Sequence, residues 1–138
     1  MVPLLLCLLA AGCASQWDLV KDSDDVDELR RYMAEHPHDA ERGRERLRII
    51  ELEYWAAVKA KSRYAYRSFL ERHSESALAL NVRKRLDELD FRESKAEKTE
   101  EAFQAYLRRH PKGRHSQEAL TGLDALRCKI GSGLVEAA

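Results

Sequence analysis

Histidine is the residue type whose spacing in this chain most readily suggests chemistry. Three of the five histidines recur every 37 residues, each closing a phrase that begins with an aromatic residue: Tyr32–His36, Phe69–His73 and Tyr106–His110. Imidazole is a common zinc ligand, so a repeated histidine suggests a metal site. Zinc needs its nitrogen ligands about 2 Å from one ion, whereas equivalent positions on neighbouring packed helices lie about 8–10 Å apart. We therefore expect a row of histidines, each ending a short helix where it bonds the last carbonyl groups.

The remaining polar residues form no catalytic motif. A cluster of acidic residues opens the first expected helix, without the glycine-containing loop of a calcium site: Asp22, Asp24, Asp25, Asp27 and Glu28. The chain has no glycine-rich phosphate loop, nucleophile elbow or paired-cysteine motif. We therefore predict that the protein is not an enzyme and uses no metal or cofactor.

The composition favours one helical domain. The 138 residues include 24 basic and 24 acidic side chains, so no overall charge attracts nucleic acid or anionic lipid. Charged residues make up 35% of the chain, with six glycines and three prolines. This balance is typical of a helical protein with a well-solvated surface.

The 37-residue interval extends beyond the histidines. Trp17, Tyr54 and Phe91 recur at it, as do three leucines. A fixed period of this length indicates stacked supersecondary units. We expect short and long helices to alternate near 24–35, 40–60, 63–73, 76–97, 100–110 and 115–130, after a stub at Trp17. Ser23, Ser62 and Thr99 are the expected N-caps. The repeat domain then covers 23–130, with units near 23–61, 62–98 and 99–130 and a flexible tail at 131–138.

The first residues are typical of a secretory signal. They are apolar, too short to span a bilayer, and end in small residues. The run Leu9-Ala10-Ala11-Gly12-Cys13 resembles the bacterial lipobox. This resemblance implies that residues 1–12 are a lipoprotein signal peptide, that Cys13 is lipidated, and that 13–22 form a linker. The alternative is an ordinary signal peptide with an accidental cysteine. With Cys7 removed and Cys13 modified, Cys128 is left without an internal partner, and we expect it to be buried on a helix face.

The repeated phrase also resembles a known family of repeats. An aromatic pair followed by Leu-x-x-His-Pro, and then by a helix ending in Arg-Leu-x-x-Leu, is similar to tetratricopeptide-like repeats. The likeness is greatest to repeat lipoproteins of bacterial outer-membrane assembly complexes, although the period here is 37 residues rather than 34. The resemblance implies an all-α fold, an α-solenoid of about three helix hairpins. It also implies a location in the bacterial envelope, anchored to the outer membrane and facing the periplasm.

Exposed aromatic residues are the expected contacts for a partner. Trp55 and Tyr64 fall off the predicted apolar stripes, and Tyr66 and Arg67 lie beside Tyr64 on a short helix. Aromatic and arginine side chains commonly anchor partner proteins. These four residues are therefore the predicted partner-binding surface. The alternative for the aromatic residues is core packing between adjacent repeats.

Together these features predict a membrane-anchored helical-repeat scaffold that binds envelope proteins or peptides and no nucleic acid. One alternative is a structural or spacer lipoprotein without a specific partner. A third is a weak metal or ligand binder that uses the repeat histidines, with His36 beside His38 or His110 beside His115.

Overall fold

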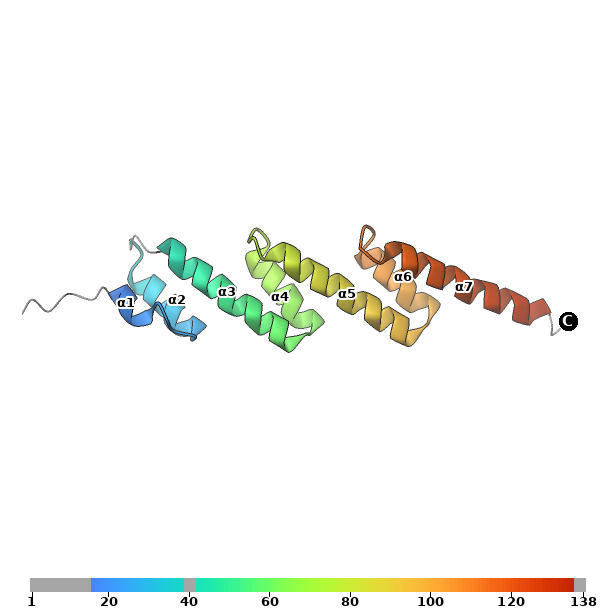
Figure 1. Ribbon diagram of the computed structural model, residues 1–138, viewed down its shortest axis with the longest axis horizontal. Helices are drawn as coiled ribbons and strands as arrows, with labels where there is room; N and C mark the ends of the chain where they lie inside the picture. Colours follow the sequence, from blue (N-terminus) through green and yellow to red (C-terminus); the bar gives the residue numbers. More distant parts are fainter. Residues whose placement is uncertain (1–15, 39–41, 136–138) are drawn as a thin grey trace, which may run out of the picture. The chain divides into compact units, whose positions relative to one another are not determined.

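The computed structural model describes residues 16–38 and 42–135 (Figure 1). Within these ranges the chain forms seven helices and no strand, which confirms the predicted all-α class. The helices are α1 (Gln16–Val20), α2 (Val26–Glu35), α3 (Arg42–Ala60), α4 (Arg63–His73), α5 (Ala79–Glu97), α6 (Glu100–Arg109) and α7 (Ser116–Val135).

The helix starts follow from capping side chains. Ser62 Oγ accepts a hydrogen bond from the Ala65 amide, and Thr99 Oγ1 accepts one from the Ala102 amide, both at 3.2 Å. The prediction of Ser23 was wrong, because Asp25 caps α2 by accepting from the Asp27 amide at 2.9 Å. A carboxylate at this position also meets the positive end of the helix dipole, which explains the preference for Asp25.

The turn from α3 into α4 and the turn from α5 into α6 have the same backbone conformation. Lys61 and Lys98, 37 residues apart, follow α3 and α5 with φ of 48° and 53°. Their amides bond the carbonyls of Ala57 and Ser94, both at 3.1 Å. A left-handed residue after the last turn ends a helix and reverses the chain. Two identical chain reversals therefore stand one period apart.

The end of α7 differs from the expectation. The helix continues to Val135, whereas the sequence analysis ended it near residue 130 and placed a flexible tail after it. Gly131 and Gly133 cost about 1 kcal/mol each as helix formers but do not block the hydrogen bonds, as a proline would. The part of the predicted tail up to Val135 is therefore helical, and residues 136–138 lie outside the described residues.

The chain divides into two compact units between Leu52 and Glu53, inside α3. In the first unit α1, α2 and the start of α3 enclose a small core of Trp17, Leu29, Tyr32 and Ile49. The division does not coincide with the expected repeat boundaries, because α3 contributes Ile49 to the first unit and Tyr54 to the second. Each half of this long helix has its own packing partners.

The second unit packs its helices in chain order. α4 lies against α5, α5 against α6, and α6 against α7 (Figure 1). The end of α3 contacts α4 through the rings of Tyr54 and Phe69. Its core contains Phe91, Phe103, Tyr106, Ala119 and Leu123. No helix in the described part of the chain is both apolar enough and long enough to cross a bilayer.

The aromatic residues that recur every 37 positions form three equivalent ring contacts. The ring pairs Trp17–Tyr32, Tyr54–Phe69 and Phe91–Tyr106 have centroid distances of 6.0, 6.0 and 5.3 Å. The two residues of each pair are 15 positions apart, and successive pairs are 37 apart. Equivalent residues in the sequence therefore have equivalent neighbours in the structure.

Candidate functional site

The repeated histidines lie at the ends of the short helices. The ring of each histidine contacts the aromatic ring four residues before it. The centroid distances are 4.3 Å for Tyr32–His36, 5.1 Å for Phe69–His73 and 5.2 Å for Tyr106–His110. His36 behaves as predicted, because its Nδ1 lies 3.0 Å from the Tyr32 carbonyl oxygen. His73 and His110 differ, since the structure gives both of them a carboxylate partner.

That partner is a buried acidic residue on the preceding long helix. His73 Nε2 lies 2.5 Å from Glu53 Oε2, and His110 Nε2 lies 2.7 Å from Asp90 Oδ2. Each carboxylate precedes its histidine by 20 residues, so Glu53 and Asp90 are themselves 37 residues apart. This pair was not predicted, although the 37-residue spacing of Glu53 and Asp90 is visible in the sequence.

Asp90 is the most heavily bonded member of the network. Its side chain is 1% exposed and accepts hydrogen bonds from Arg63 Nε at 2.6 Å and His110, with Arg109 at 3.1 Å. Burial alone raises the pKa of such a carboxyl. The bonds from His110, Arg63 and Arg109 outweigh burial and leave the pKa of Asp90 below its usual 3.8. One ionised side chain on α5 therefore links the start of α4 to the end of α6.

A second buried carboxylate fixes the loop after α6. Asp87 accepts hydrogen bonds from the Tyr106 hydroxyl at 2.6 Å and from the Arg114 amide at 2.8 Å. Burial, together with the bond to Asp87, raises the pKa of Tyr106, which stays a neutral donor. Gly113 permits this close approach, because a Cβ there would stand 2.6 Å from Asp87 Oδ1 and 2.7 Å from the Tyr106 hydroxyl oxygen.

The sequence shows that this bond is specific to one repeat. The residues 37 positions before Asp87 and Tyr106 are Ile50 and Phe69, which have neither the carboxylate nor the hydroxyl. A buried hydroxyl needs an acceptor, and a buried carboxylate needs a donor. Both polar groups are therefore present in the repeat of Tyr106 and absent from that of Phe69, whereas the repeat of Tyr32 has the hydroxyl and a cysteine in place of the carboxylate.

One ion pair recurs with its charges exchanged. Arg63 at the start of α4 binds Asp90 of α5, 27 residues later. One period on, Glu100 at the start of α6 accepts from Arg127 of α7 at 2.8 and 2.6 Å, again 27 residues later. Equivalent positions thus keep the pairing with either polarity, which indicates a structural role for the contact.

We call this network of hydrogen bonds and ion pairs a structural joint, because it connects neighbouring helices. The carboxylates, the Tyr106 hydroxyl and the two histidines are bonded to one another or to the backbone. Within residues 16–38 and 42–135 no three His, Cys, Asp or Glu side chains lie close enough to hold a metal ion. His115 lies apart from His110, stacked on Phe91 at 4.4 Å and bonded to Glu88 at 2.8 Å.

The predicted partner-binding residues are only partly exposed. Trp55 on α3 is 57% exposed, and Tyr64 on α4 is 82% exposed. Arg67 is exposed on the same helix, and with Tyr64 it lines a surface hollow of about 500 Å³. The inclusion of Tyr66 was wrong, because it is 4% exposed and belongs to the core. Residues 64 and 66 lie about 200° apart around a helix, so only one of them can face outward.

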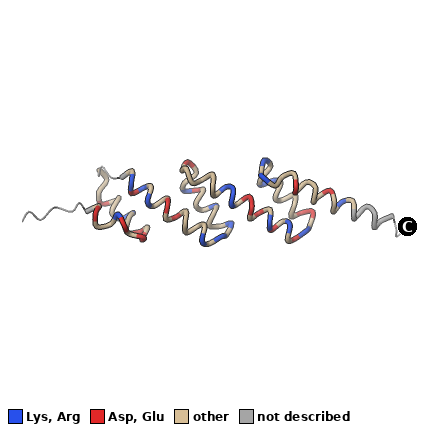
Figure 2. Tube along the Cα trace, in the orientation of Figure 1, with Lys and Arg blue, Asp and Glu red and all other residues tan. Residues whose placement is uncertain are grey.

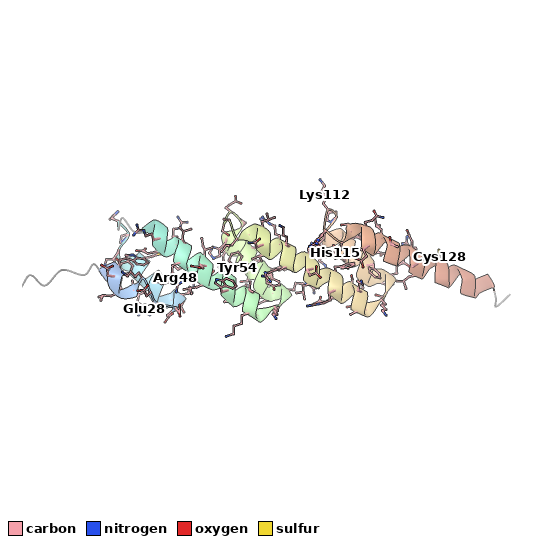
Figure 3. The ribbon with its side chains drawn as sticks, viewed as in Figure 1. Glu28, Arg48, Tyr54, Lys112, His115 and Cys128 are labelled. Carbon is pink, nitrogen blue, oxygen red and sulfur yellow. The ribbon has the colours of Figure 1, made fainter. Side chains whose placement is uncertain are left out.

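The two cysteines singled out in the sequence have different outcomes. Cys13 lies outside the described residues, and its lipidation stays a prediction. Cys128 is exposed on α7 (Figure 3), so the expectation that it is buried was wrong. The buried face of α7 carries Ala119 and Leu123, with Leu126 packed beside them, and Cys128 lies off that face.

The second unit also has a hollow that was not predicted from the sequence. It measures about 740 Å³, lies between α5 and the α6–α7 loop, and adjoins another of about 380 Å³ through Lys84, Glu88 and Arg114. Basic residues predominate among those that line both hollows. Figure 2 marks Lys and Arg in blue along the trace, and Lys112 projects outward from the loop in Figure 3. We call the following residues the cationic surface: Lys61, Arg83, Lys84, Arg85, Arg92, Lys112 and Arg114.

Comparison with known proteins assigns the chain to no family. No protein-family model, curated protein or solved structure matches it.

Proposed function

We propose that this chain is a non-enzymatic helical-repeat scaffold of the bacterial envelope, anchored by lipid at Cys13, which holds protein partners on its exposed side chains. The observation that carries the proposal is the recurrence of one contact set at 37 residues. The aromatic pair recurs in three repeats, and the histidine–carboxylate pair in two. The repeated residues pack and bond with one another within the fold. The function therefore depends on the exposed surface.

The recurrence also supports a finer architecture. In our interpretation α2–α3, α4–α5 and α6–α7 are three tetratricopeptide-like hairpins of an α-solenoid, with α1 in the position of a preceding long helix. Trp17 of α1 makes the contact with Tyr32 that Tyr54 and Phe91 make in later repeats. Repeat arrays bind other proteins because stacking leaves an extended surface on the outside.

Partner binding is tested by site-specific photo-cross-linking in cells. A photoreactive amino acid at Tyr64 or Trp55 is expected to give discrete cross-linked products, because both side chains are more than half exposed. The matched control places the same amino acid at Asp124, an exposed position on α7. Absence of products at both aromatic positions, or the same products at Asp124, would favour the spacer function instead.

The lipid anchor has its own test. Cys13→Ser removes the thiol that would carry the lipid, and we expect the protein to move from the membrane to the soluble fraction. Acyl chains contribute about 0.8 kcal/mol for each buried CH₂, so their loss should be decisive. Cys128→Ser is the control and should leave the distribution unchanged. A Cys13→Ser protein that still sediments with membranes would contradict the anchor.

A further inference from the structure

The cationic surface is a local feature of a chain without net charge. The protein has 24 basic and 24 acidic residues, but the two hollows are lined by seven basic residues and two acidic ones, Asp87 and Glu88. Like charges held together repel, so their concentration opposes folding unless something compensates for it. An anionic partner would provide that compensation.

Several basic residues outside this surface form ion pairs. In the second unit Arg63 binds Asp90, Lys95 binds Glu118 at 2.7 Å, and Arg127 binds Glu100. By contrast, no ion pair within the described part of the chain involves the cationic-surface residues Lys84, Arg85, Arg92 and Lys112.

The two acidic residues that line the hollows already form hydrogen bonds within the fold. Asp87 is 8% exposed and accepts from the Tyr106 hydroxyl and the Arg114 amide. Glu88 lies 2.8 Å from His115 Nε2. Both carboxylates therefore already have partners within the fold, and the seven basic residues outnumber them, so an excess of positive charge remains for an external anion.

We propose that the cationic surface binds an acidic segment of the partner protein, in an extended conformation. This inference rests on the proposed scaffold function and names the chemistry of its partner. Lys84 and Arg92 lie about 12 Å apart along α5 at 1.5 Å per residue. An extended chain rises about 3.3 Å per residue, so about four of its residues lie alongside this stretch. Carboxylates at alternate positions would meet the basic side chains, and arginine can bind a carboxylate with two hydrogen bonds.

The shape and composition of the surface favour a peptide over a membrane or nucleic acid. The basic residues line hollows beside α5, whereas membrane-binding surfaces combine charge with exposed apolar side chains that enter the lipid. The large apolar residues lining the hollows, Tyr66 and Leu89, are 4% and 8% exposed. Neither of these two side chains is therefore available to enter lipid, and the Tyr66 ring cannot stack on a nucleic-acid base.

The test is fluorescence anisotropy with the purified full chain and a labelled peptide of alternating Glu and Ser residues. We expect binding to this peptide and not to the same peptide with Gln in place of Glu. The variant Lys84→Glu/Arg114→Glu should weaken binding about tenfold or more, because two attractive contacts become repulsive. The control variant Lys59→Glu/Arg108→Glu makes the same change of charge at exposed sites outside the surface, and should bind within about threefold of the wild type.

Three results would overturn the inference. Equal weakening in both variants would show that net charge, and not this surface, governs binding. Equal affinity for the Glu and Gln peptides would exclude carboxylate recognition. Binding to phosphatidylglycerol vesicles that depends on Lys84 and Arg114, without peptide binding, would assign the surface to a membrane. If any of these occurs while the cross-links from Tyr64 and Trp55 persist, the acidic-segment inference fails and the scaffold function stands.

Discussion

Replacing Leu123 with aspartate is expected to unfold the second unit of the protein. Leu123 is 6% exposed and packs in one core with Phe91, Phe103 and Tyr106. Aspartate would remove the apolar contacts and place a charge in this core, where the clustered residues offer it no basic partner. The expected loss is at least about 4 kcal/mol in the free energy of unfolding. Urea titration followed by far-ultraviolet circular dichroism measures it.

The matched control is Leu120→Asp on the same helix. Leu120 is 43% exposed, so the same chemical change there should alter the free energy of unfolding by about 0.5 kcal/mol or less. If Leu123→Asp were as stable as Leu120→Asp, the core between α6 and α7 would be wrongly placed.

The second large effect is expected for Asp90→Asn. The substitution keeps the shape of the side chain but removes the charge that Arg63, Arg109 and His110 share. Loss of one member of a buried ionic network typically costs about 3 kcal/mol. The control is Glu93→Gln, because Glu93 is 46% exposed and also pairs with Arg63. Its loss should cost less than about 1 kcal/mol, and equal effects of the two variants would argue against a central role for Asp90.

The effect of Asp90→Asn should also depend on pH. The pKa of Asp90 in the folded protein lies below its usual value of 3.8, so the folded state binds this proton less readily than the unfolded state. The stabilisation is therefore complete above about pH 5 and is lost as the pH falls through the folded pKa. The difference in urea midpoint between wild type and variant should narrow below about pH 4. A difference that stayed constant would assign the effect to packing rather than to charge.

Most helices of the fold were predictable because their signals are local. Ser62 and Thr99 mark the starts of α4 and α6 in the sequence and cap them in the structure. The 37-residue interval located the recurring aromatic pairs before any contact was known. Periodicity and capping depend on neighbouring residues, so a single sequence contains enough information to place them.

The polar network was not predicted because its contacts join distant segments. The sequence around His110 indicates only the end of a helix. Asp90 lies 20 residues earlier, and the packing of α5 against α6 brings it to His110. The same difficulty affected Tyr66, whose burial depends on which side of α4 faces α5. Of the cationic surface, Lys112 and Arg114 belong to a C-terminal unit that is mildly basic in the sequence. Lys84 lies 30 positions before Arg114, and only the fold brings the two to one hollow.

The central claim is that the repeated histidine is a structural joint, which leaves function to the exposed surface. The most direct measurement is a double-mutant cycle of Asp90→Asn and His110→Ala in the full chain, followed by urea unfolding. A joint predicts a coupling free energy of about 1–3 kcal/mol, because either substitution alone already breaks the bond. Fully additive losses, with no coupling between Asp90 and His110, would contradict it.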